Sequence, residues 1–561
     1  MAATKKPIRK KATRKPAAKK SAVKKSAAKK PPAKKKKSVV KALVARAKPA
    51  AARKQTAKKA ASKPPRPTTR GKLPLPAGHF VASPPAPKPA RRAAGRGPLE
   101  ARKKAPGVKI ATLQKPEFKR LFDPETLAIL ADLHEAFNTR RLGLLARRLE
   151  RRARLAKGET FDFPQGTRHI RASGWRVPPL PGELADRRVE LALPPDAVAS
   201  PTSPIALKTF VDFEGTAAPT WTRTLHGHAA MLDHFAGAPG LKPRGLRLPE
   251  AGAKIDGEEL SGGLFDLGLF ARHAAPAMSR AGVIPRVFLS GVEGYLEARL
   301  WGDALARIER RAGLSRAAIK TTVIIDSWPA LFELDEIMFE IRERAVALVL
   351  APSDVAASRL ELATPDEGIA GGPRSTLSGD FLSACRAAVV RVAHRRGALA
   401  LVSLSEDDDP AAWVAAGFDG ALVRSPLATD TIRAAFPAPN QLETPVAEHP
   451  PERGALGAFP AGAPTRDDVG AAIAGGVEAA RSWLAGGKSG LGFGQARLAA
   501  AHLSHWLRAK AETRNAGVVS REMVRQLSSG LVDVPSKRFL DHVLNAEDGD
   551  DLLMAFTRNP A

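Results

Sequence analysis

Short apolar runs alternate with stretches of helical periodicity over residues 205 to 437. This alternation is typical of parallel β/α units, in which a helix follows each buried strand and covers the sheet. We therefore predict strands at 206–213, 240–248, 286–290, 321–325, 346–350, 398–404 and 420–423. In a closed (β/α)₈ barrel, the polar residues that follow these strands would lie at one rim, where active sites form. They are Glu214, Glu293, Asp326, Asp354, Glu406 and Arg424.

Two successive apolar runs end near a carboxylate. Residues 321–325 are rich in β-branched side chains and precede Asp326, and residues 346–350 precede Asp354. Acids at the carboxyl ends of neighbouring barrel strands are suited to hold a divalent cation. They could equally face the loops and cap the helices that follow, and the pattern alone does not choose between the two interpretations.

The flanking regions have a helical pattern. We predict one helix from Asp123-Pro-Glu-Thr126, with an acidic first turn and apolar positions that include Leu130 and Phe137, and a second, Arg-rich helix over 140–155. Residues 436–466 are rich in Pro, Gly and Ala, which predicts a linker. Further helices are expected at 467–484, 496–511 and 520–527.

The positive charge of the chain is concentrated in its first 105 residues. Of 90 Lys and Arg residues 35 lie there, with a single acid, Glu100; the remainder has 55 of each sign. Repeats such as Lys15-Pro-Ala-Ala-Lys-Lys20 resemble the tails of linker-histone-like proteins. This composition predicts a disordered tail that binds nucleic acid or another polyanion in a salt-dependent manner, or one that merely solubilises the chain. Aromatic residues are not interleaved with the charges, so base stacking is not indicated.

The chain has one cysteine, Cys385, which excludes an intrachain disulfide and a cysteine-based metal cluster. No stretch approaches the roughly 18 to 20 apolar residues of a membrane span, and the N-terminus lacks the apolar segment of a secretory signal. We expect a cytoplasmic protein without membrane contact, which the tail could attach to the nucleoid.

Several motifs in the body resemble malate synthase, in its shorter A-type form, over nearly all of residues 117 to 530. They occur in the order of the family: 122–127 (Phe-Asp-Pro-Glu-Thr-Leu), 168–171 (Arg-His-Ile-Arg), 186–190 (Asp-Arg-Arg-Val-Glu), 212–214 (Asp-Phe-Glu), 243–245 (Pro-Arg-Gly), 296–301 (Leu-Glu-Ala-Arg-Leu-Trp) and 394–398 (His-Arg-Arg-Gly-Ala).

The resemblance implies an α/β fold, a (β/α)₈ TIM barrel with an N-terminal helical clasp and a C-terminal helical plug. We expect the basic tail at 1–105, the clasp at 106–205, the barrel at 206–437, the linker at 438–466 and the plug at 467–561. The family condenses acetyl-CoA with glyoxylate and releases malate and CoA. This reaction uses Mg²⁺ to polarise the aldehyde, a carboxylate base and an arginine that stabilises the enolate.

Carrying the family's roles onto this sequence gives a candidate site with several departures. The metal ligands fall on Asp326, where the family has Glu, and on Asp354, whose neighbours differ from the family's Gly-Arg-Trp-Asp. The catalytic arginine falls on Lys242, or on Arg244 if the register shifts. Glu214 is kept from the family's Asp-Phe-Glu-Asp motif.

The largest departure is at the proton-abstracting base. The family's Leu-Met-Glu-Asp-Ala-Ala-Thr corresponds to residues 489–495, which places Gly492 where the base should be. A missing general base lowers the rate by about 10²- to 10⁴-fold. The resemblance therefore implies weak, altered or lost malate synthesis. Alternatives are a degenerate barrel whose tail binds nucleic acid, or a citrate-lyase-like or aldolase-like enzyme acting on an acyl-CoA.

Overall fold

The computed structural model describes residues 107–557 except 114, 198–207, 234–239, 369–370, 373–375, 378, 406–407, 460–461, 488–490 and 546–551. The predictions for the basic tail and for Glu406 lie outside the described residues. Within the described part, no helix is both long and apolar enough to cross a membrane.

Eight parallel strands close into a barrel in the order β10-β11-β2-β3-β4-β7-β8-β9, which confirms the predicted fold class. Large inward-facing side chains fill its interior, and the rings of Phe210 and Phe288 stack with centroids 4.2 Å apart. The strands are β2 (Val189–Leu193), β3 (Lys208–Asp212), β4 (Gly240–Lys242), β7 (Arg286–Leu289), β8 (Lys320–Ile325), β9 (Ala345–Leu350), β10 (Leu399–Ser403) and β11 (Gly420–Val423).

The barrel starts earlier in the chain than residue 206, because β2 is one of its eight strands. This strand lies within the stretch predicted to be the clasp, so the predicted boundary is wrong at this point. A glutamate at its second position, Glu190, conceals the apolar pattern. That carboxylate is buried and accepts hydrogen bonds from Arg187 (2.9 and 2.8 Å) and from Arg286 of β7 (2.8 Å). A buried charge is tolerated only with such partners.

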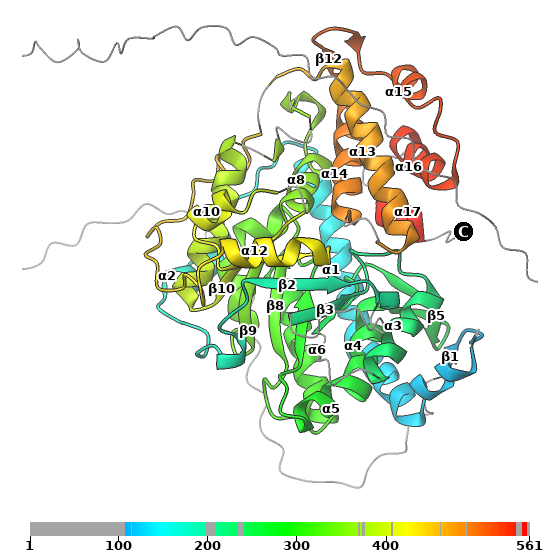
Figure 1. Ribbon diagram of the computed structural model, residues 1–561, viewed down its shortest axis with the longest axis vertical. Helices are drawn as coiled ribbons and strands as arrows, with labels where there is room; N and C mark the ends of the chain where they lie inside the picture. The colour runs from blue at the N-terminus through cyan, green and yellow to red at the C-terminus, as the bar shows by residue number, and fades with distance from the viewer. Residues whose placement is uncertain are drawn as a thin grey trace, which may run out of the picture. The chain divides into compact units, whose positions relative to one another are not determined.

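Helices alternate with the strands and cover the barrel from outside (Figure 1). Between β3 and β4 lies α3, and between β4 and β7 the chain forms a short sheet and two helices. The helices are α3 (Trp221–Asp233), α4 (Gly262–Leu269), α5 (Ala275–Arg280), α6 (Tyr295–Arg311), α7 (Leu334–Glu340), α8 (Pro352–Glu361), α10 (Gly379–Arg396), α11 (Ala411–Ala415) and α12 (Thr429–Ala435).

The N-terminal region is built on one long helix, α1 (Pro124–Leu155), where the sequence suggested two. No proline interrupts the run, and Gly143 alone does not end a helix that is packed on one side. The Asp123 carboxylate caps its first turn by accepting from the Thr126 backbone N–H at 2.7 Å. Its buried face, including Leu130, packs against α4 close to Gly268. The remaining elements are α2 (Arg168–Ala172) and an antiparallel sheet of β1 (Val108–Ile110), β5 (Pro249–Ile255) and β6 (Glu258–Ser261).

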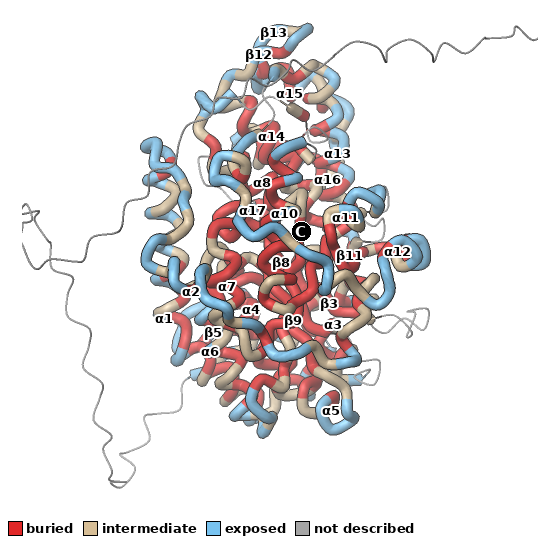
Figure 2. Tube along the Cα trace, turned by 90° about the vertical axis from the view of Figure 1, so that its left-hand side faces the viewer, coloured by how far each residue is buried: buried red, intermediate tan, exposed pale blue. Residues whose placement is uncertain are grey.

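The C-terminal helices form a second core around Trp483, Trp506 and Phe539. Buried residues occur both in the barrel strands and in the helices α13 and α14 (Figure 2). The indole N–H of Trp483 donates to the Glu214 carbonyl (2.8 Å), and the Phe493 N–H donates to the Gly215 carbonyl (3.0 Å). The helical region therefore rests directly on the mouth of the barrel. Its elements are α13 (Arg466–Ala485), α14 (Phe493–Arg508), β12 (Glu512–Thr513), β13 (Gly517–Val518), α15 (Arg521–Leu527), α16 (Val534–Asn545) and α17 (Leu552–Thr557).

The predicted linker has no helix or strand among its described residues before Arg466, where α13 begins, yet it is packed against the barrel. The Gln441 side chain donates to the carbonyls of Val414 and Phe418 at 3.1 and 2.7 Å. The indole N–H of Trp328 donates to the carbonyl of Leu456, which is fully buried. The segment thus connects the barrel to the plug and is held against the barrel by these hydrogen bonds.

Candidate active site at the barrel mouth

A cavity of about 60 Å³ lies at the carboxyl ends of the barrel strands, closed from above by the start of α14. At about 10–15 Å³ for each water-sized position, it has room for only a handful of non-hydrogen atoms. Both charged and apolar side chains line it. The polar ones are Asp212, Glu214, Lys242, Ser290, Asp326, Asp354, Ser403 and Arg424, and Phe493 and Gly494 form its roof.

Asp326 and Asp354 come together in this cavity from neighbouring strands, as the metal-site interpretation predicted. Asp326 directly follows β8, and its Oδ2 accepts from the Gly291 N–H at 2.7 Å. Its Oδ1 is buried and has no hydrogen-bond partner within the described part of the chain. Burial, and next the negative charge of Asp354, raise the pKa of Asp326 to about 6. Burial also raises the pKa of Asp354, against the positive charges of Arg497 and Arg424.

Neither acid is the N-cap residue of the helix that follows it, although Asp354 lies in the first turn of α8. The N-cap of α8 is Ala351, and no side chain caps that helix. Asp354 instead faces the first turn of α14, where a Cβ on Gly494 would lie 2.4 Å from its Oδ2. A residue larger than glycine at 494 would therefore displace this carboxylate.

The pair is suited to a divalent cation. An unpartnered carboxylate oxygen and two buried like charges both favour a bound positive charge. Mg²⁺ is often held by one or two carboxylates, with water and substrate completing its shell. No group of three or more His, Cys, Asp and Glu side chains in the described residues is arranged to hold a metal. The two aspartates are therefore candidate ligands only as a pair.

Lys242 lies at the end of β4 and forms a buried ion pair. Its Nζ donates to Asp212 Oδ1 at 2.8 Å, and the same oxygen accepts from the N–H groups of Glu214 and Gly215. Burial alone would lower the pKa of Lys242, but the charges of Asp212 and Glu214 outweigh it and raise that pKa. Lys242 is therefore a fixed cation and not a proton acceptor at neutral pH.

Glu214 lies in the lining and is held in place by the neighbouring loop. Its Oε2 accepts from the Gly245 N–H at 2.6 Å, and its Oε1 is 3.7 Å from the Arg247 guanidinium. The structure thus brings Glu214, Lys242, Asp326 and Asp354 into one cavity.

Arg244 is not part of that cavity. Its guanidinium is buried in a separate ion-pair network, donating to Glu250 Oε2 at 2.6 Å and to both carboxylate oxygens of Asp266 at 2.7 and 2.9 Å. Asp266 also contacts His228, at 3.1 Å. The expectation that Arg244 could serve as the catalytic arginine is therefore not met, because its donors are already used to hold the β4 loop against α4.

Gly492 is the N-cap residue of α14 and lies beside the cavity. A Cβ at this position would lie 2.6 Å from Arg424 Nε and 3.0 Å from the Gly215 carbonyl oxygen. The plug thus approaches the barrel through backbone at the position where the resemblance places the carboxylate base. No side chain of the described part of α14 supplies an acid to the lining.

Two residues of the site received no catalytic role from the sequence. Asp212 was part of a motif, but its ion pair with Lys242 shows only in three dimensions. Arg424 was noted as a rim residue after β11, and its position at a strand end was the signal that could have placed it in the site.

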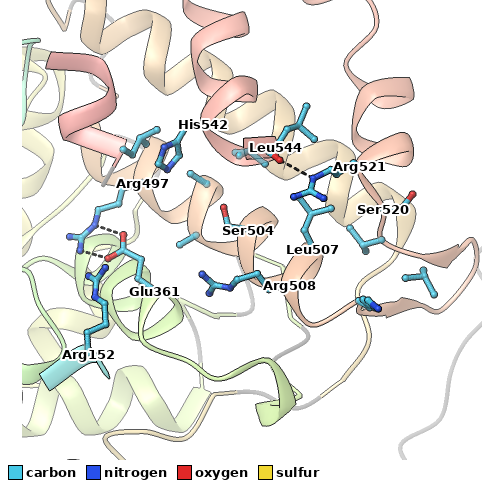
Figure 3. Close-up of a pocket in the computed structure, with 17 residues that line it drawn as sticks. Arg152, Glu361, Arg497, Ser504, Leu507, Arg508, Ser520, Arg521, His542 and Leu544 are labelled. Carbon is cyan, nitrogen blue, oxygen red and sulfur yellow. Dashed lines mark hydrogen bonds and ion pairs between the residues drawn. The ribbon is translucent and has the colours of Figure 1, made fainter. Parts of the chain in front are cut away.

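A second and larger cavity, of about 360 Å³, lies along α14 (Figure 3). Its lining includes Arg152, Arg508 and Arg521, and Arg497 there forms a bidentate ion pair with Glu361. Arg497 also reaches to 3.7 Å from Asp354 Oδ1. This cavity has no pair of carboxylates like that of the barrel mouth, so it is not the candidate active site.

The fold and the site define a (β/α)₈-barrel protein with a carboxylate-bearing centre at the carboxyl ends of its strands, closed by a helical domain. Comparison with protein families matches residues 241–407 to the TIM barrel domain of malate synthase and residues 106–169 to its N-terminal domain. The malate synthase of Myxococcus xanthus is 31% identical over 426 residues, which cover 68% of this chain and 79% of that protein. That of Streptomyces clavuligerus is 31% identical over 476 residues, which cover 74% and 88%.

These matches show that the chain belongs to the malate synthase family, as the motifs indicated. Among solved structures, the Haloferax volcanii malate synthase in its magnesium/glyoxylate complex is 14% identical, with a TM-score of 0.40 and coverage of 64% of this chain and 98% of that one.

Proposed function

We propose that this protein is a Mg²⁺-dependent enzyme that forms or cleaves a carbon–carbon bond between a small 2-oxo acid and an acyl-CoA. The pairing of Asp326 and Asp354, with Asp326 Oδ1 left without a hydrogen-bond partner among the described residues, carries the proposal. Bound Mg²⁺ would supply Lewis-acid polarisation of the oxo group. Family membership makes acetyl-CoA and glyoxylate the first substrates to test.

The chain's own residues support this chemistry in three ways. The two aspartates would hold the cation, and Lys242 and Arg424 place positive charge beside the position of the reacting acid. The plug, through Phe493 and the Trp483 hydrogen bond, closes the cavity and excludes water. The small cavity suits a two- or three-carbon 2-oxo acid.

Malate synthesis should nevertheless be slow, because Gly492 provides no proton acceptor for the methyl group of acetyl-CoA. Cleavage of a hydroxy-acyl-CoA, as in citrate-lyase-like or aldolase-like enzymes, is the second candidate, since such a reaction need not begin with that proton transfer. Synthesis and cleavage would use the same two aspartates and the same cation. They differ in their substrates, so assays with each substrate distinguish them.

The first experiment measures glyoxylate-dependent release of CoA from acetyl-CoA by the full chain with Mg²⁺. Enzymes commonly turn over at about 10 s⁻¹, so loss of the base predicts a rate of roughly 10⁻³ to 10⁻¹ s⁻¹ that EDTA abolishes. Pyruvate and a hydroxy-acyl-CoA are tested in parallel. Turnover unaffected by EDTA, or none with any substrate, would contradict the proposal and favour a degenerate barrel.

The basic tail supports a separate proposal, binding of nucleic acid through residues 1–105, which carry 35 cations and one acid. We expect the full chain to bind a random-sequence DNA duplex, with an affinity that falls by about 10³-fold or more between 50 and 200 mM salt. A chain beginning at residue 107 is the control and should not bind. Fluorescence polarisation measures both, and equal binding by the two chains would place the interaction elsewhere.

A further inference from the structure

Arg424 is a charged lining residue whose hydrogen-bonding capacity is not fully used. It directly follows β11 and lines the barrel-mouth cavity. Its Nε is buried and meets no acceptor in the described part of the chain. Leaving a buried charged donor without an acceptor is unfavourable, because the group has lost its hydrogen bonds to water. An anion that enters the cavity would recover this free energy.

Gly492 provides the space in which this guanidinium lies. A Cβ there would be 2.6 Å from Arg424 Nε and 2.9 Å from its Cζ, so any larger residue would force the side chain to move. The glycine at 492 and the position of the Arg424 side chain are therefore coupled. On this side of the cavity the lining carries a positive group.

The other cation of the lining cannot serve in the same way. Lys242 is committed to Asp212 through a 2.8 Å hydrogen bond, and both side chains are buried. The other acids of the lining have partners or roles of their own. Glu214 accepts a hydrogen bond from the Gly245 N–H, and Asp326 and Asp354 are the candidate ligands of the cation. Arg424 is thus the cation of the described lining that is available to a substrate.

We propose that Arg424 binds the carboxylate of the 2-oxo acid, with Gly492 providing the space for its guanidinium; this inference rests on the function proposed above. A planar guanidinium matches the two oxygens of a carboxylate. With the oxo group directed at Asp326 and Asp354, the carboxylate would extend toward β11. Arg424 then selects acids over neutral aldehydes and ketones.

The test is direct binding, which does not depend on a fast reaction. Isothermal titration measures the affinity of the full chain for glyoxylate and for pyruvate in the presence of Mg²⁺, and the affinity for Mg²⁺ alone. Four chains are compared: the unaltered protein, Arg424→Met, Arg424→Lys, and Arg433→Met as a control. Arg433 is a partly exposed arginine on α12 whose nearest acid, Asp186, is 3.8 Å away. Methyl glyoxylate serves as the uncharged ligand.

Arg424→Met should weaken binding of both acids by about 10- to 100-fold, the range for a charge-assisted hydrogen bond. Binding of the methyl ester should not change. Affinity for Mg²⁺ should stay the same or rise, because the variant removes a positive charge near Asp354. Arg424→Lys should lie between the two, and Arg433→Met should resemble the unaltered protein.

Two results would overturn the inference while leaving the proposed function in place. One is unaltered acid binding in Arg424→Met; the other is a parallel loss of acid, ester and Mg²⁺ binding, which would make Arg424 structural. If the unaltered protein bound Mg²⁺ but no 2-oxo acid, the proposed function would fail together with the inference. A fall in kcat at unchanged affinity would assign Arg424 to a developing oxyanion and also contradict carboxylate binding.

Discussion

The substitution Asp326→Asn is expected to weaken Mg²⁺ binding strongly and, at the same time, to stabilise the metal-free protein. The substitution keeps an oxygen for the Gly291 N–H but removes a charge that lies buried beside Asp354. Loss of one of two carboxylate ligands should weaken Mg²⁺ by about 100-fold or more. Titration calorimetry measures this loss, and CoA release should disappear with it.

The stabilising effect should depend on pH in a defined direction. The pKa of Asp326 is raised from 3.8 to about 6, so the folded protein holds this proton more tightly than the unfolded chain does. Ionisation of Asp326 therefore costs stability, fully above about pH 6, and this cost disappears as the pH falls toward 4. A raised pKa of this size corresponds to about 3 kcal/mol.

Thermal unfolding in EDTA checks this expectation. Asp326→Asn should melt a few degrees above the unaltered protein at pH 8, and the difference should shrink at pH 5. Asp303→Asn, at an exposed aspartate that pairs with Arg140, is the matched control for loss of a carboxylate. A lower melting temperature for Asp326→Asn at pH 8, together with unchanged Mg²⁺ affinity, would rule out the metal pair.

The strands of the barrel could be predicted where burial leaves an uninterrupted apolar run, as at β8 and β9. The strand β2 could not, because one of the two arginines that make a buried Glu190 tolerable, Arg286, lies far along the chain. The long helix α1 was divided in two because a change in surface charge resembled a boundary. The buried face of α1 continues through this change in charge, and it keeps the segment as one helix.

In the candidate site, too, some residues could be predicted from their positions in the sequence, whereas others depend on contacts between distant parts of the chain. Strand ends and family motifs placed Asp326, Asp354, Glu214 and Lys242 in one cavity, and the structure brings them together. Residue type alone could not separate Arg244 from Arg424. Both are arginines next to barrel strands, but only the contacts show that the donors of one are used and that Nε of the other is not.

Restoring a carboxylate by Gly492→Asp should increase glyoxylate-dependent CoA release and also raise KM for glyoxylate. The backbone at 492 is extended, a conformation that aspartate adopts readily at an N-cap. The new Cβ would press on Arg424 Nε, which can move because it has no hydrogen bond to break within the described part of the chain. The displaced guanidinium would then pair with the introduced carboxylate.

That ion pair determines the size of the effect. A neighbouring positive charge lowers the pKa of a carboxylate and makes it a weaker base. The expected gain in kcat is therefore about 10- to 100-fold, at the lower end of what a general base contributes. Because the introduced carboxylate would compete with the substrate carboxylate for Arg424, KM should rise in the same variant.

Steady-state kinetics with Gly492→Asn as the control separate charge from shape, since asparagine caps the helix and presses on Arg424 equally but cannot accept the proton. A gain in kcat with aspartate and none with asparagine would identify residue 492 as the lost base position. Equal rates in the two variants would show that the base must come from elsewhere in the cavity, and Glu214 would then be the next residue to change. A gain in kcat without any rise in KM would separate the base position from the substrate carboxylate and weaken the role proposed for Arg424.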